Sequence, residues 1–99
     1  MTEKRLRIRS EAQEEINSAF EYYLQRNPTV ADAFLTQIEI ALKQIVAHPN
    51  FHPPYTKNSR RNILEKFPYS VIFREKEETI LVVAVAHAKR RFGYWLSRI

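Results

Sequence analysis

The residues best suited to chemistry lie in the last thirteen positions of the chain, which begin at His87. This histidine ends the apolar run 80–86, and it is followed by Lys89, Arg90, Arg91, the pair Tyr94 and Trp95, and Arg98, with no acidic residue after Glu78. An imidazole at the end of a strand beside several cations can hold an anionic ligand or act on a phosphate. The alternative is a solvated rim whose aromatic pair packs on the core.

The composition limits the classes of protein that the chain can belong to. Its 99 residues, 44% of them hydrophobic, suffice for one core, so we expect a single domain spanning residues 1–99. Cysteine is absent, which excludes disulfides and thiolate chemistry. The first residues lack the apolar core of a signal peptide, and the longest apolar run is too short for a bilayer. We therefore expect a cytoplasmic protein.

The charge is unevenly distributed along the sequence. Residues 1–55 carry six Lys/Arg and seven Asp/Glu, whereas residues 56–99 carry ten Lys/Arg and four Asp/Glu. The second half thus has a net charge of +6, which indicates an acidic protein partner or a nucleic acid. A surface charged only for solubility is the alternative.

The elements that must position these residues begin with a strand and two helices. Cationic and apolar residues alternate over residues 5–9, which predicts an edge strand with its arginines outward. Ser10 and Gln13 have the spacing of a capping box, which predicts a helix running to about Arg26 and stopped by Asn27-Pro28. A second box at Thr29 opens a helix that ends at His48-Pro49, and the short break makes the two helices an antiparallel hairpin.

Strands occupy most of the remaining sequence. We expect a loop over residues 48–59, because three prolines in six residues disfavour strand pairing. Strands follow at 60–67, 69–74 and 79–86, with a charged turn at 75–78 and a short helical turn near the end. The predicted fold is α+β, in the order β-α-α-β-β-β. It consists of an antiparallel sheet with the helical hairpin packed on one face and the C-terminal turn partly covering the other.

These residues resemble the RelE/ParE superfamily of toxins over nearly the whole chain. The resemblance rests on the order and spacing of Ala12, Ile16, Tyr22-Tyr23, Phe34, Ile38, Ala41-Leu42, Ile45, His48-Pro49, Arg60-Arg61, Leu64, Phe67-Pro68-Tyr69, Ile72-Phe73, Ala84, His87, Arg90, Tyr94-Trp95 and Arg98. It implies a small cytoplasmic bacterial protein of a type II toxin–antitoxin module, with the fold predicted above. It also implies a hetero-oligomer with a cognate antitoxin, whose acidic or amphipathic segment wraps the partly covered sheet face and folds on binding.

The superfamily contains two chemistries. One branch cleaves messenger RNA on the ribosome without a metal. In that case the catalytic residues here would be His87 as acid or base, Arg61, Arg74 and Arg90 as phosphate ligands, and Tyr94 as a stacking group or proton donor. The other branch, linked to plasmid stabilisation, inhibits DNA gyrase by binding and has no known catalysis of its own.

Spacing favours the gyrase-directed branch. Ala88 separates His87 from the basic residues, the first arginine is Arg90, and the loop from Lys57 to Arg61 lacks the dense lysines of the nuclease. Phe92 stands where that branch commonly has proline. The residues expected to bind the target or the antitoxin are Arg60, Arg61, Lys89, Arg90, Arg91, Tyr94, Trp95 and Arg98. A non-toxic nucleic-acid-binding module is a further alternative.

Several of these residues also have purely structural interpretations. His87 can simply end a strand and bond a neighbour, and Tyr94 and Trp95 can pack on the helical hairpin. Arg60 and Arg61 should point to opposite faces of their strand. His48 and His52 are too few to form a metal site, and the single glycine leaves no phosphate-binding loop, so we expect no metal and no cofactor.

Overall fold

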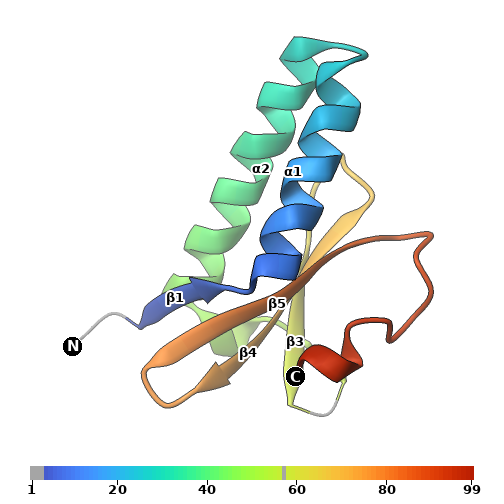
Figure 1. Ribbon diagram of the computed structural model, residues 1–99. Coiled ribbons are helices and arrows are strands. Elements are labelled where there is room, and N and C mark those ends of the chain that lie inside the picture. Colours follow the sequence, from blue (N-terminus) through green and yellow to red (C-terminus); the bar gives the residue numbers. More distant parts are fainter. Residues whose placement is uncertain (1–3, 57) are drawn as a thin grey trace.

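A computed structural model describes residues 4–56 and 58–99 as a five-stranded sheet with a helical hairpin on one face (Figure 1). The elements in chain order are β1 (Arg5–Ile8), α1 (Ser10–Leu24), α2 (Pro28–Ala47), a 3₁₀ turn (Pro49–Phe51), β2 (Pro54–Thr56), β3 (Ser59–Ile63), β4 (Tyr69–Lys76), β5 (Thr79–His87) and a second 3₁₀ turn (Leu96–Arg98). The α+β class, the helical hairpin and the short C-terminal turn are confirmed. No described helix is both long and apolar enough to cross a membrane.

The sheet is mixed, which corrects the expectation that all of its strands are antiparallel. Its strand order is β1-β5-β4-β3-β2, and β1 runs parallel to β5 with Arg5 opposite Thr79. The reason is topological. Strand β3 is antiparallel to β4, and β4 is antiparallel to β5, so β5 runs in the same direction as β3. Strand β1 also runs in that direction, and it therefore pairs with β5 in parallel.

The segment predicted to be a loop contains a short strand. Pro54 of β2 lies opposite Arg60 of β3 at the outer edge of the sheet. An edge strand needs hydrogen bonds on one side only, so a proline without an N–H group is tolerated there. The proline content limited the length of this strand but did not prevent pairing.

The helix starts also differ from the predicted capping boxes. Helix α1 begins at Ser10 itself, and its N-cap residue Arg9 makes no side-chain cap. Helix α2 is capped by Asn27, whose Oδ1 accepts hydrogen bonds from the backbone N–H groups of Thr29 (2.9 Å) and Val30 (3.4 Å). Asn27-Pro28 therefore starts the second helix, because proline suits the first helical position.

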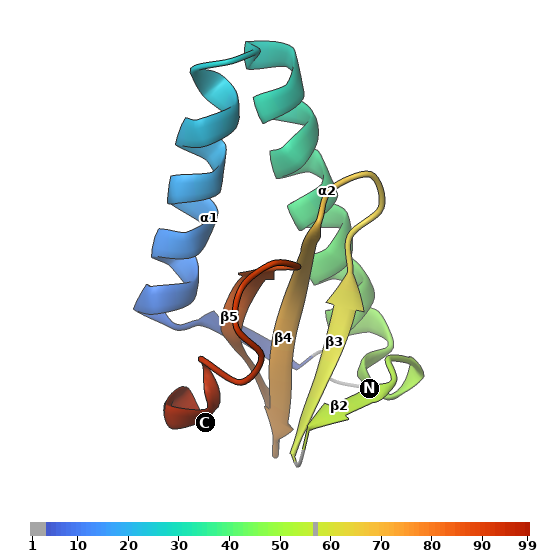
Figure 2. The ribbon, with the colours of Figure 1, turned by 90° about the vertical axis from the view of Figure 1, so that its right-hand side faces the viewer.

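Two apolar clusters hold the sheet, one on each face. The larger lies under the helical hairpin and includes Ile16, Phe34, Ile38, Phe73 and Val82. The smaller surrounds Trp95 and includes Ile72, Val83, Ala84 and Ala86. Trp95 therefore packs on the face opposite the hairpin, where the C-terminal turn was expected, and not on the hairpin itself. Figure 2 shows the C-terminal segment crossing that face beside β5.

Candidate functional site

Glu15 of α1 connects three parts of the chain that are far apart in sequence. Its Oε1 accepts hydrogen bonds from the backbone N–H of Val85 (2.9 Å) and from Nη1 of Arg98 (3.0 Å). Its Oε2 accepts from the hydroxyl of Tyr94 (2.7 Å) and from Nη2 of Arg98 (3.3 Å). The Glu15 side chain is only 15% exposed. We call Glu15, Tyr94 and Arg98 the Glu15 cluster; it fixes the C-terminal segment to α1 and β5.

The Glu15 cluster occupies a place where the sheet lacks a neighbouring strand. Strand β1 pairs with β5 only as far as Val82, so within the described residues no strand lies beside the rest of that edge. Arg98 Nη1 donates to the carbonyl of Val83 (3.1 Å), and Glu15 accepts from Val85. Unpaired edge groups attract other strands. These two side chains satisfy two of the groups that a strand would otherwise bond.

Burial and charge fix the protonation states in this cluster. Burial raises the pKa of Tyr94, and the hydrogen bond to Glu15 and its negative charge raise it further, so the phenol stays protonated and donates. Burial opposes the charge of Arg98, but the hydrogen bond and charge of Glu15 outweigh burial and raise its pKa. A tyrosine held in this way is a hydrogen-bond donor and a poor base.

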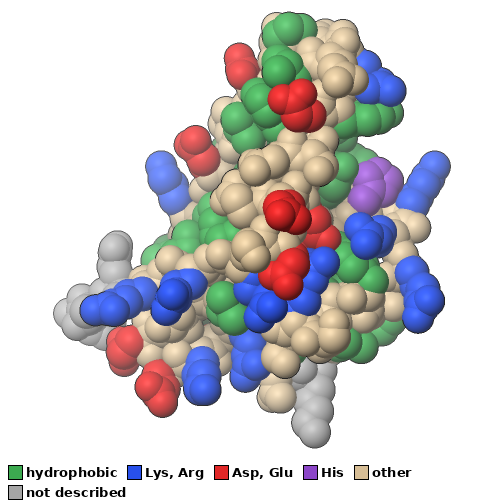
Figure 3. All heavy atoms as spheres, viewed as in Figure 1, with side chains coloured by type: hydrophobic (Ala, Val, Ile, Leu, Met, Phe, Trp, Pro, Cys, Tyr) green, Lys and Arg blue, Asp and Glu red, His purple; other side chains and the backbone are tan. Residues whose placement is uncertain are grey.

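Three cations lie in the turn that follows β5. Lys89, Arg90 and Arg91 are exposed, and so is Phe92, which is 63% exposed. We call these four residues the basic turn. The guanidinium of Arg90 lies 3.9 Å from the centre of the Tyr94 ring, and its side chain is 55% exposed. Figure 3 shows Lys and Arg side chains gathered at the right of the molecule, over the turn after β5.

His87 has a structural role in this arrangement. Its Nδ1 accepts a hydrogen bond from the backbone N–H of Lys89 (3.0 Å), and its ring lies edge-on to Tyr69, with 4.9 Å between the ring centres. It lines a groove of about 500 Å³ with Glu15, Arg90 and Arg98. The ring therefore ends the strand and bonds a neighbour.

The candidates for RNA cleavage are divided between the two faces of the sheet. His87 contacts Tyr69, which packs against the cluster under the hairpin. The guanidinium of Arg61 lies 4.0 Å from the ring centre of Tyr55, which stacks on Trp95 on the opposite face. Arg74 follows the inward-facing Phe73 and also lies on that opposite face. The structure brings His87, Arg90 and the Glu15 cluster together, whereas Arg61 and Arg74 lie on the opposite face of the sheet from His87.

Arg60 and Arg61 point to opposite faces of β3, as predicted. Arg60 Nη1 donates to the carbonyl of His52 (2.6 Å), whereas Arg61 stacks on Tyr55. Lys57 begins the loop that was predicted to lack the dense lysines of the nuclease, and it lies outside the described residues.

Sequence reasoning missed Glu15, although a signal for it exists. Ala12, Glu15, Ile16 and Ala19 have the 3–4 spacing of one helix face, so the carboxylate lies at the border of the buried stripe. A carboxylate at that border with an arginine-rich segment elsewhere in the chain indicates a partly buried ion pair.

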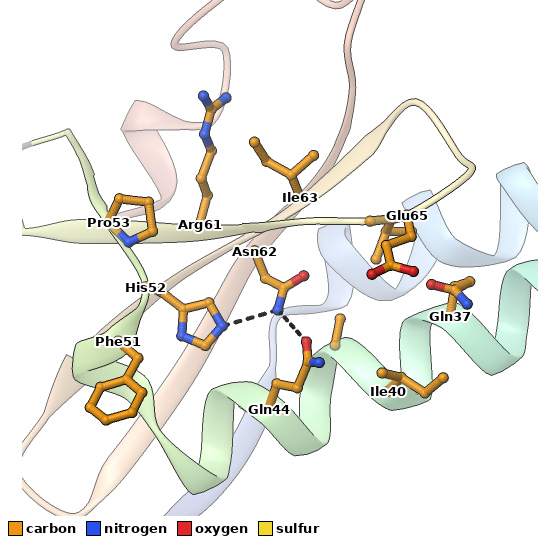
Figure 4. A pocket seen from close by; sticks show the side chains of 12 residues that line it. Gln37, Ile40, Gln44, Phe51, His52, Pro53, Arg61, Asn62, Ile63 and Glu65 are labelled. Atoms are coloured by element: carbon orange, nitrogen blue, oxygen red, sulfur yellow. Dashed lines mark hydrogen bonds between the residues drawn. The ribbon is translucent and has the colours of Figure 1, made fainter.

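The sequence also did not indicate a polar network beside α2. Asn62 Nδ2 lies 3.0 Å from Gln44 Oε1 and 3.0 Å from His52 Nε2, in a pocket of about 280 Å³ (Figure 4). His52 Nδ1 lies 3.1 Å from the carbonyl of His48, so the tautomer protonated at Nδ1 satisfies both contacts. His52 is thus engaged in structural hydrogen bonds.

Comparison with known proteins identifies the class. Residues 6–92 match the family model for the ParE toxin of the type II toxin–antitoxin system parDE. Toxin ParE2 of Mycobacterium tuberculosis, from strain CDC 1551 / Oshkosh and from strain ATCC 25618 / H37Rv, is 31% identical over 85 residues, which cover 85% of this chain and 81% of the relative. A solved chain of the chromosomal ParDE TA system from P. aeruginosa shares the fold with a TM-score of 0.76 and 20% identity, covering 87% of this chain and 97% of that one.

Sequence and fold therefore agree on a toxin of a type II toxin–antitoxin system. Within that class, the chain belongs to the ParE toxin family, as the resemblance to the RelE/ParE superfamily predicted.

Proposed function

We propose that this toxin inhibits DNA gyrase by binding, with the basic turn as its docking surface, and that a cognate antitoxin neutralises it in the cytoplasm. The observation that carries the proposal is the anchoring of the basic turn. The Glu15 cluster holds the chain just after the turn, and backbone bonds from Ala88 to Pro68 (2.7 Å) and from Arg90 to His87 (2.9 Å) hold it at the start.

Anchoring at both ends supports a binding role. Three exposed cations and an exposed phenylalanine stand on a backbone whose conformation is already fixed, so less entropy is lost when they bind a partner. Their common charge accelerates encounter with an acidic surface. An aromatic side chain surrounded by exposed cations is common at protein interfaces.

The same geometry argues against RNA cleavage. A phosphate bound near His87 is on the wrong face of the sheet for Arg61 and Arg74. His87 Nδ1 is occupied by the N–H of Lys89, and Tyr94 is held as a donor to Glu15. General acid–base catalysis needs such groups within reach of one reacting site.

Neutralisation follows from the charge of the docking surface. An acidic antitoxin segment that covers Lys89, Arg90 and Arg91 competes directly with gyrase for the same cations. The complex is then a hetero-oligomer in which the antitoxin blocks the basic turn.

The decisive experiment compares the purified chain in a gyrase supercoiling assay and in a cleavage assay with messenger RNA on translating ribosomes. We expect loss of supercoiling and intact RNA. The double variant R90E/R91E should lose gyrase inhibition, whereas R26E/K43E, with the same change in net charge on the helical hairpin, should retain it. His87→Ala should also retain it.

Three results would overturn this proposal. Cleaved RNA that depends on His87 with normal supercoiling would establish the nuclease. Equal loss of inhibition in the two double variants would show that the basic turn is not a specific docking surface. An effect on neither target would favour a non-toxic nucleic-acid-binding module.

A further inference from the structure

The strand register places cations in two rows on the sheet face that the helical hairpin leaves free. Leu81 of β5 lies between Arg7 of β1 and Arg74 of β4, and Thr79 lies between Arg5 and Lys76. Directly paired residues point to the same side of a sheet. Because Ile80 and Val82 pack under the hairpin, these two rows point to the opposite face.

A groove of about 590 Å³ runs along this end of the sheet, next to the turn from β4 to β5. It is lined by Arg7, Arg9, Arg74, Lys76 and Arg98, and by one acidic residue, Glu77. The groove therefore has an excess of positive charge. It is separate from the basic turn, whose four residues are not part of its lining.

Three of these cations have no acidic partner in the part of the chain that the structure describes. Arg9 pairs with Glu11 (3.1 Å) and Arg98 with Glu15 (3.0 Å), but Arg7, Arg74 and Lys76 make no ion pair there. The nearby Glu75 pairs instead with Lys4 (2.8 Å). These three side chains are available to an external anion.

Arg74 supplies the strongest sign of an external ligand. Its Nε is buried and has no hydrogen-bond partner among the described residues. A buried donor without a partner costs free energy, and a guanidinium next to other cations is also repelled by them. An anion in the groove would bind the accessible end of this guanidinium and relieve the repulsion.

We propose that this groove binds the phosphodiester backbone of double-stranded DNA. The planar guanidinium forks of Arg7 and Arg74 match the oxygens of a phosphate group. The strand spacing sets the Cα atoms of these residues roughly 7 Å apart along β4 and about 10 Å apart across the β1-β5-β4 strands. The sheet therefore carries the positive side chains at regular intervals, which suits a regular line of phosphates.

The lining of the groove distinguishes duplex DNA from other polyanions. No aromatic ring is among its described lining residues, so single-stranded bases would find no stacking platform. Its apolar lining residues are Ile8, Leu81 and Ile99, fewer than its five cations, which favours an anionic backbone over the apolar side chains of an extended peptide. Binding is through the backbone and independent of base sequence. The proposal goes beyond gyrase inhibition, since it requires no gyrase.

Fluorescence anisotropy of the intact chain with a labelled short DNA duplex, over a series of salt concentrations, tests the proposal. We expect the R7Q/K76Q variant to bind more weakly at low salt, with a slope of log affinity against log salt that is smaller by about two. The matched variant R26Q/K43Q loses the same charge on the helical hairpin and should keep the slope of the parent chain.

Several outcomes would overturn the proposal. Equal weakening in the two variants would show only general attraction between opposite charges. Tighter binding of the single strand would require a stacking surface elsewhere. If polyglutamate of equal charge displaced the duplex as well as unlabelled duplex does, the groove would be a site for an acidic protein segment. Gyrase inhibition by R7Q/K76Q, measured in parallel, separates this proposal from the docking role of the basic turn.

Discussion

Glu15 and Arg98, 83 positions apart, bond to each other and to successive outward-facing groups of β5. The Glu15 carboxylate accepts a hydrogen bond from the N–H of Val85, and the Arg98 guanidinium donates one to the carbonyl of Val83. The pair thus continues the line of β1 with side chains where the strand itself has ended at Ile8. The position of the basic turn depends on this contact.

Replacing Glu15 with alanine should therefore destabilise the whole chain. The change leaves Arg98 without its partner and the Val85 N–H without an acceptor, and we expect a loss of about 2 kcal/mol in the free energy of unfolding. Urea denaturation followed by circular dichroism measures it. The control is Glu14→Ala, one position away and exposed, which should change stability by less than about 0.5 kcal/mol. Equal stability of the two variants would contradict the role of Glu15.

Tyr94 should make stability depend on pH in the alkaline range. Because burial and the bond to Glu15 raise its pKa, the phenol ionises in the unfolded chain before it ionises in the folded one. Its contribution is complete below the ordinary pKa of 10.0 and is lost as the pH rises above that value. We expect Tyr94→Phe to lose about 1 kcal/mol at neutral pH and to show a shallower decline above about pH 10.

Denaturation of the parent chain and of Tyr94→Phe at neutral and at alkaline pH tests this prediction. Tyr23 and Tyr69 also have raised pKa values through burial, so part of the alkaline decline should persist in the variant. An unchanged slope would mean that the Tyr94 phenol ionises as freely in the folded chain as in the unfolded one.

Trp95 should be the main apolar anchor of the C-terminal segment. Its side chain is 1% exposed, stacks on Tyr55 and packs on Ile72 and Val83. Trp95→Ala should cost about 3–5 kcal/mol in a denaturation experiment. Phe92→Ala should cost much less stability, because Phe92 is 63% exposed and meets Tyr55 and Trp95 only edge-on, but it should weaken gyrase inhibition. Similar stability losses would show that both rings contribute equally to packing.

Charge reversal should weaken binding of the antitoxin in a salt-dependent way. We expect R61E/R90E to bind the cognate antitoxin more weakly than the parent chain, with a larger difference at low salt than at high salt. Arg90 should account for most of the effect, because it is 55% exposed whereas Arg61 packs on Tyr55. Titration calorimetry of the double and single variants at two salt concentrations measures it. Affinity that does not change at either concentration would rule out the basic turn as an antitoxin contact.

The sequence predicted those parts of the fold that depend on local patterns. The hairpin of α1 and α2 follows from the helical spacing of Ile16, Phe34 and Ile38, and the interior position of β5, between β1 and β4, follows from its continuous apolar run. The direction of β1 could not be predicted in this way. It depends on which of two distant strands it meets, and alternation over residues 5–9 contains no information about that partner.

The candidate site was predicted in residue type but not in arrangement. Arg90, Tyr94 and Arg98 do meet, but the residue that joins them is Glu15, whose role becomes visible only when α1 lies over β5. Trp95 was assigned to the wrong face because a large aromatic residue indicates burial without indicating which side of a sheet covers it. Arg61 and Arg74 were grouped with His87 by charge alone, whereas the alternation of side chains along β4 and β5 separates them.

The pairing of β1 with β5 also has a consequence for synthesis on the ribosome. Residues 5–8 leave the exit tunnel early, but their partners, residues 79–82, are made more than seventy positions later. Glu15 is likewise synthesised long before Tyr94 and Arg98, the residues to which it bonds. A nascent chain therefore cannot present the anchored basic turn, which reaches its final position only once nearly the whole polypeptide has emerged.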